Sequence, residues 1–287
     1  MGHVPRHEVY PEFSAKKLLD LEEQITGLIG AVAHSPWWLN MLMNTAWARL
    51  GHSFAVDPRG ASGDTWDSAL FACQVGEAIF KVASADEGVP VEVELGDQVV
   101  RTTGAGPSHY SNAGQWVTSV WLAYVTMNEP LIQRLIAVPE ELLRASKEDV
   151  PEYLYALAEV IRRFSRSGSS AAEAINAALR ATDPAVVPEL MRTYALKIVV
   201  PVLGIFQEIG DRDSERFNLA LEEALVQHRE YWTATDEEES DPVGFFALGP
   251  LALTVFANAV RIPVTVESEY LPHHVAAGTW PRERGAL

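Results

Sequence analysis

The chain has 287 residues, of which 48% are hydrophobic and 21% are charged, and its formal net charge at pH 7 is −17. These totals suit a globular protein of one large domain or two packed halves, and they exclude long disordered spans. The negative charge disfavours direct binding to nucleic acid or anionic lipid, whose phosphates would be repelled. The single cysteine, Cys73, excludes an intrachain disulfide and a thiolate metal cluster, and its apolar neighbours predict a buried thiol.

The start of the chain lacks the apolar core of a signal peptide, and no apolar run elsewhere reaches the length of a membrane-spanning helix. We therefore expect a cytoplasmic protein. Residues 1–11 form a lead-in, in which His3 and His7 are expected to be exposed to solvent.

Three amphipathic helices are predicted next, over residues 12–33, 36–50 and 66–83, because apolar residues recur there at three- and four-residue spacing. A serine and a proline open the second helix. We expect its three tryptophans to pack in the core rather than to form a ligand cage: Trp37, Trp38 and Trp47.

A small β-hairpin is predicted over residues 91–102, where VEVELGDQVVRT alternates apolar and polar residues on both sides of Gly96-Asp97. Two strands alone cannot enclose a core, so the hairpin should pack on the helical body.

A loop rich in Gly, Ser and Asn spans residues 103–114 and leads into a helix that begins near Asn112. The backbone N–H groups at such a helix start can hold an anion, and His109 would lie beside them. The explanation that we favour is a structural cap with a buried histidine.

In the second half, short helical segments follow one another, each bounded by Pro, Gly, Asp or Ser. Pro201 lies inside the apolar run IVVPVLGIF and should kink or split its helix. The segment 243–260 is apolar nearly all round, so we expect one continuous helix there, central to the core.

The predicted fold is therefore mostly α, with antiparallel helical hairpins around a central apolar helix and one small β-hairpin near 91–102. We find no fixed-period repeat, and a solenoid-like arrangement is an open alternative. The domain prediction is a single domain over 1–287, which two packed halves near 1–128 and 129–287 could make up.

Negative charge is concentrated between Gln207 and Asp241, where twelve acidic residues and three arginines give a net charge of −9. Such crowding costs stability through self-repulsion. One explanation is a solvated face. The other is a docking edge for a cationic protein, with aromatic anchors beside it. The candidate partner-binding residues are Tyr231, Trp232, Asp236, Glu237, Glu238 and Glu239.

The sequence carries no signature of a serine-hydrolase elbow, nucleotide-binding loop, zinc protease or dithiol motif, and no metal or cofactor is expected. Polar and aromatic residues could nevertheless converge on a small-molecule pocket, with His228 as a base that Glu267 or Glu269 orients. The candidate pocket residues are His109, Asn112, Trp116, His228, Tyr270 and His273. The candidate catalytic residues of such an enzyme are His228, His109, Glu269 and Tyr231.

Several blocks of the chain, in order, resemble the immunity protein 49 family. They are RHEV (6–9), VDPRGASGDTW (56–66), GPSHYSNAGQWVTSVWLA (106–123), HREYWTATDEEESDPVGFFALGPLAL (228–253) and VESEYLPHHV (266–275). The resemblance implies a mostly α protein, encoded beside a toxin of a bacterial polymorphic toxin system, typically in actinomycetes, that neutralises this toxin.

The leading hypothesis is thus a non-enzymatic immunity protein that binds a basic cognate toxin in the cytoplasm of the producing cell. The alternative is a helical enzyme or small-molecule-binding protein recruited to a specialised-metabolite pathway. The sequence itself identifies neither the toxin nor the oligomeric state.

Overall fold

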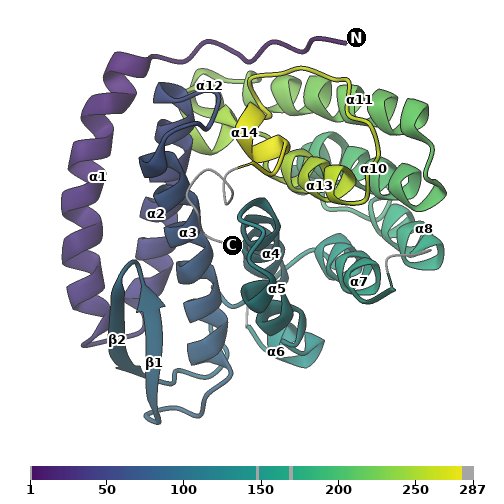
Figure 1. The fold of residues 1–287 in the computed structure, drawn as a ribbon. Helices are drawn as coiled ribbons and strands as arrows, with labels where there is room; N and C mark the ends of the chain where they lie inside the picture. The colour runs from purple at the N-terminus through teal and green to yellow at the C-terminus, as the bar shows by residue number, and fades with distance from the viewer. Residues whose placement is uncertain (1, 147–148, 168–170, 280–287) are drawn as a thin grey trace. The chain divides into compact units, whose positions relative to one another are not determined.

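The computed structural model describes residues 2–146, 149–167 and 171–279, and these residues form a mostly helical protein with one small antiparallel sheet (Figure 1). The prediction of a mostly α fold with a small hairpin is confirmed. The chain divides into two compact units. The N-terminal unit is Tyr10–Val150, and the C-terminal unit combines the residues up to Val9 with those from Pro151 onward.

The N-terminal unit consists of helices and the hairpin. Helix α1 packs beside α2, α2 beside α3, and α3 beside both α4 and α5 (Figure 1). In chain order, its elements are α1 (Pro11–Val32), α2 (Trp38–Val56), α3 (Gly63–Ala83), β1 (Pro90–Leu95), β2 (Gln98–Thr103), α4 (Ala113–Val125), α5 (Glu129–Ile136) and α6 (Glu140–Arg144).

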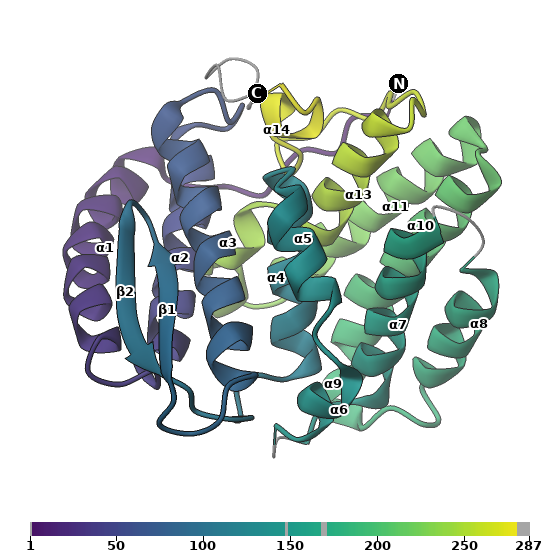
Figure 2. The ribbon, with the colours of Figure 1, turned by 60° about the horizontal axis from the view of Figure 1, so that its bottom comes forward.

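The hairpin lies against the helical body, as its alternating sequence predicts. Its strands pair in antiparallel register from Pro90↔Thr103 to Leu95↔Gln98. One face, which includes Val93 and Val100, is buried. β1 packs on α3 and β2 lies toward α1 (Figure 2).

The expected core role of the α2 tryptophans is wrong for Trp37 and Trp38, which are 54% and 42% exposed. The buried stripe of α2 passes through Leu39, Leu42 and Ala46, at three- and four-residue spacing. Trp38 precedes this stripe by one residue, and its side chain therefore falls outside it. Trp47 is half-buried.

The boundary between the two units lies after Val150, whereas the halves considered from the sequence divide near residue 128. Helix α5 remains with the first unit because it packs on α3 and α4. The Nε1–H of Trp116 in α4 also donates a hydrogen bond to the Leu135 carbonyl at 2.7 Å.

The C-terminal unit is a set of packed helices and one extended N-terminal segment. Helix α7 packs on α8, and α10 packs on α8, α11 and α13. Its elements are α7 (Glu152–Ser167), α8 (Ala172–Ala181), α9 (Glu189–Tyr194), a π-helix (Ala195–Val199), α10 (Val200–Asp211), α11 (Ser214–Trp232), α12 (Asp236–Ser240), a 3₁₀-helix (Pro242–Phe245), α13 (Leu248–Ala259) and α14 (His273–Ala276).

Pro201 follows a change of helix type and not a break: the π-helix ends at Val199, Val199 and Val200 keep right-handed helical dihedrals, and Pro201 stands in the first turn of α10, so the predicted split does not occur. Proline lacks an N–H and its ring clashes with the carbonyl four residues earlier, so it disrupts a continuous α-helix.

The prediction of one continuous helix over 243–260 is wrong. Residues Pro242–Phe245 form a 3₁₀-helix, Phe246 is extended with φ −146° and ψ 148°, and α13 begins at Leu248. The clash of a proline ring with the carbonyl four residues earlier explains the break, because Pro250 would clash with the Phe246 carbonyl in a continuous helix. By length and composition alone, Pro242–Ala259 could span a membrane, contrary to expectation, but 67% of it is buried inside the protein, as in a core segment.

Candidate functional site

The acidic edge, defined as Asp236–Glu239 with Asp241, follows directly after α11. Thr235 caps α12 by accepting a hydrogen bond from the Glu238 N–H at 3.2 Å, and its hydroxyl donates to Glu238 Oε2 at 3.1 Å. Asp241 Oδ1 accepts the Val243 N–H at 2.9 Å and so caps the 3₁₀-helix. Caps at both ends thus hold the acidic edge in a defined conformation.

The acidic edge is available to a partner. Asp236, Glu237 and Glu239 are exposed. Within the described residues, none of the carboxylates of the acidic edge forms an ion pair with a cationic side chain. Acidic residues in the first turn of a helix are stabilised by its dipole, which offsets part of their mutual repulsion.

Tyr231 and Trp232 lie at the end of α11 and are half-buried, as two neighbouring rings 5.1 Å apart. Burial raises the pKa of Tyr231, and the charges of Glu238 and Asp241 act in the same direction. The Tyr231 ring also lies edge-to-face on Tyr194, with centroids 5.7 Å apart. Trp232 instead packs on the backbone of Gly244, where an added Cβ would lie 2.6 Å from Trp232 Cδ2. Tyr231 is therefore the better placed of the two for contact with a partner.

His228 is buried in the C-terminal unit, and its Nε2 lies 3.0 Å from the Gly244 carbonyl oxygen. Its ring centroid is 4.8 Å from that of Tyr270, which is completely buried. Burial lowers the pKa of His228 to about 4, so the ring is neutral at pH 7.

The expected pairing of His228 with Glu269 is not present. Glu269 contacts the N-terminal segment instead: its Oε2 accepts the Arg6 N–H at 3.2 Å, and its Oε1 lies 3.6 Å from His3 Nε2. The backbone hydrogen bonds to Glu269 lower the pKa of its carboxyl group, although burial acts in the opposite direction as the largest single effect. His228 therefore has no carboxylate of Glu269 to orient it as a base.

His7 also belongs to this buried cluster, and the expectation that it is exposed is wrong. Its Nδ1 lies 2.7 Å from the Tyr270 hydroxyl, and burial lowers its pKa to about 4. Arg6 donates to the Phe245 carbonyl at 3.3 Å, and Val4 donates to the Glu267 carbonyl at 3.1 Å. Since these contacts join residues more than 200 positions apart, no local sequence signal indicates them.

The block around His109 lies in the N-terminal unit. Asn112 caps α4 by accepting the Gln115 N–H at 3.0 Å, as expected, and its Nδ2 donates to the His109 carbonyl at 2.9 Å. The histidine itself is exposed rather than buried, and its ring stacks on Trp37 with centroids 6.1 Å apart and an interplanar angle of 15°. Trp116 is fully buried.

The candidate pocket residues are thus divided between the two units. His228 and Tyr270 are in contact in the C-terminal unit, and His273 stands exposed at the start of α14 in the same unit. His109, Asn112 and Trp116 belong to the N-terminal unit, where the polar groups of the last two bind the backbone. A shared pocket for all six stays a prediction.

Sequence reasoning missed an exposed aromatic surface at the start of α2. Trp37, Trp38 and Met41 are all more than 40% exposed, and Trp37 lies edge-to-face on Tyr110 with centroids 5.8 Å apart. The helical phase gives the signal that could have found it, because Trp38 and Met41 are three residues apart and both one residue ahead of the buried Leu39 and Leu42.

Comparison with known proteins gives one family. The family described as Immunity protein 49 matches residues 57–275, which include the acidic edge, His109 and His228 and leave out the N-terminal block at 6–9. No curated protein and no solved structure matches the chain. Since the match covers well over half of the 287 residues, the chain belongs to the immunity protein 49 family.

Proposed function

We propose that this protein is a cytoplasmic immunity protein, which binds a basic toxin domain in the producing cell and blocks its active surface. Membership of the immunity protein 49 family supports the general role. The single observation that supports this way of binding is the acidic edge, whose carboxylates are ordered by caps and have no cationic partner within the described residues.

The acidic edge would act mainly on the rate of association. Charges that complement a partner steer its approach and raise the association rate constant, whereas they contribute less to the dissociation rate. Tyr231, near the end of α11, would then supply apolar contact area once the partner has docked. This division of roles makes the proposal testable by kinetics.

The test measures association with the protein encoded by the neighbouring gene, by stopped-flow fluorescence at several salt concentrations. The triple variant Asp236→Asn/Glu237→Gln/Glu239→Gln leaves unchanged the capping residue Thr235 and Glu238, its hydrogen-bond partner. We expect its association rate at low ionic strength to fall by about tenfold, with a flatter dependence on salt.

The matched control removes the same number of charges from exposed positions elsewhere, in the variant Asp86→Asn/Glu87→Gln/Glu189→Gln. If steering came from total charge alone, both variants would slow association equally. An association rate that is unchanged in the first variant would refute the role of the acidic edge.

A further inference from the structure

The strand β2 has a free backbone edge. Gly96 and Asp97 form a two-residue turn in which Gly96 alone has positive φ, at 65°, as in a type II′ hairpin turn. In such a hairpin the residues that flank the turn form a hydrogen-bonded pair, and hydrogen-bonded pairs then alternate with non-bonded ones. The register therefore directs the N–H and C=O groups of Val99 and Arg101 away from β1.

Among the described residues these outward groups have no hydrogen-bond partner, since no hydrogen bond there involves the backbone of Val99 or Arg101. On the other side of the hairpin, β1 is covered by α3, and the Gln74 side chain binds the N–H and C=O of Gly96. The hairpin is thus protected at one edge and open at the other. Folded proteins usually cover or blunt such an open edge, because it pairs with other strands.

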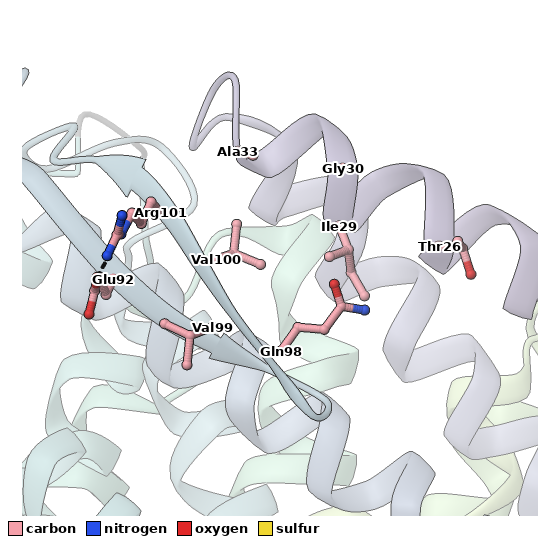
Figure 3. A pocket seen from close by; sticks show the side chains of 9 residues that line it. All are labelled: Thr26, Ile29, Gly30, Ala33, Glu92, Gln98, Val99, Val100 and Arg101. Atoms are coloured by element: carbon pink, nitrogen blue, oxygen red, sulfur yellow. Dashed lines mark hydrogen bonds and ion pairs between the residues drawn. The ribbon is translucent and has the colours of Figure 1, made fainter.

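A groove of about 600 Å³ runs along this open edge, between β2 and the second half of α1 (Figure 3). On the strand side it is lined by four consecutive residues of β2, whose side chains alternate between the two faces, and by Glu92 of β1. A hydrogen bond of 2.7 Å from Thr102 Oγ1 to the Val32 carbonyl ties the same strand to the end of α1. The lining residues are Thr26, Ile29, Gly30, Ala33, Glu92, Gln98, Val99, Val100 and Arg101.

The walls of the groove suit an extended backbone with apolar side chains. Gly30 in α1 and Ala33, which follows its last residue, are small, so a chain can approach this end of the helix closely. Ile29 is half-buried, and Val99 is 64% exposed although it is apolar. A strand added to β2 would cover Val99 and satisfy the unpaired backbone groups at the same time.

The charge of the hairpin indicates which kind of segment would bind in the groove. The solvent face of the hairpin carries Glu92, Glu94 and Asp97 against the single cation Arg101, a net charge of −2. Glu92 and Arg101 form an exposed ion pair at 2.8 Å, which contributes little stability and can exchange for another cation. The hairpin therefore favours a strand that carries Lys or Arg.

We propose that β2 is a strand-addition site, which captures an extended, basic segment of the cognate toxin as a third strand in the groove against α1. This inference rests on the proposed function, because it names a second contact for the same partner. Backbone hydrogen bonds would provide affinity, and the alternating side chains of the captured segment would provide specificity.

The test compares two double variants in binding to the protein encoded by the neighbouring gene. Val99→Pro/Arg101→Pro removes the two outward N–H donors, and proline is tolerated at the edge of a sheet. Val99→Ala/Arg101→Ala removes the same side chains but keeps both donors. We expect the proline variant to weaken binding at least tenfold more than the alanine variant, with the same thermal unfolding midpoint in both.

Hydrogen exchange gives a second measurement that needs no variant. In the complex, the amides of Val99 and Arg101 should become protected from exchange, whereas in the free protein they exchange as solvent-exposed groups. Complex formation without this protection, or with equal binding by both variants, would overturn strand addition and leave the proposed function intact. If the wild-type protein forms no complex at all, both proposals fail. If the wild-type protein is instead a dimer that the proline variant converts to monomer, β2 pairs with a second copy and the toxin-strand proposal is wrong.

Discussion

Each unit of this protein has a histidine in contact with aromatic rings, but the two clusters differ in burial. In the C-terminal unit, His7 and His228 contact Tyr270 and all three side chains are buried. In the N-terminal unit, His109 and Trp37 stack at the surface. The same residue types therefore serve stability in one place and remain available for contact in the other. Both clusters combine histidine with aromatic rings, so burial and not residue type separates the roles.

The largest expected difference between the clusters is in the free energy of unfolding. Tyr270→Ala removes a completely buried ring and its hydrogen bond with His7, and it should destabilise the protein by about 3–5 kcal/mol. Trp37→Ala removes a ring that is 54% exposed and should cost less than about 1 kcal/mol. Urea unfolding followed by circular dichroism measures both. Equal losses in the two variants would refute the distinction between the clusters.

The second expected difference is in pH dependence. His7 and His228 have a pKa of about 4 in the folded protein, lowered chiefly by burial, against about 6.5 in the unfolded chain. The unfolded state therefore binds more protons between these values. The contribution of these two histidines to the free energy of unfolding is fully present above pH 6.5. It should fall as the pH drops toward 4, by about 1.4 kcal/mol per histidine for each pH unit.

The variant His228→Leu isolates this effect, because it removes one of the two titrating groups from the cluster. Its free energy of unfolding should depend on pH about half as steeply as that of the wild type between pH 6.5 and 5. The matched comparison is His109→Leu, at the exposed ring, which should keep the wild-type slope. A wild-type slope in the His228 variant would show that this histidine is not held neutral by burial.

Local signals in the sequence predicted local structure well. The hairpin follows from strict alternation around Gly96-Asp97, and the start of α4 from the capping residue Asn112. In each case the interactions that decide the structure join residues close in sequence.

The failures concern contacts that are distant in sequence or depend on helical phase. His7 is buried by Tyr270, which is 263 residues away. Trp38 lies one residue outside the buried stripe of α2. Its apolar side chain suggests a position in the core, but its place in the helical repeat puts that side chain at the surface. The break before α13 was predictable, since Pro250 excludes a continuous helix by the same rule that was applied to Pro201.

The most direct test of the central claim is a growth experiment. A bacterial host expresses the neighbouring gene from an inducible promoter, with or without this protein, and the growth rate is measured after induction. We expect growth to stop without the protein and to be restored with it, and the two proteins to co-elute from a sizing column. If growth continues without the protein, or stops although both proteins are soluble and present, the account of this chain as a toxin-neutralising immunity protein is contradicted.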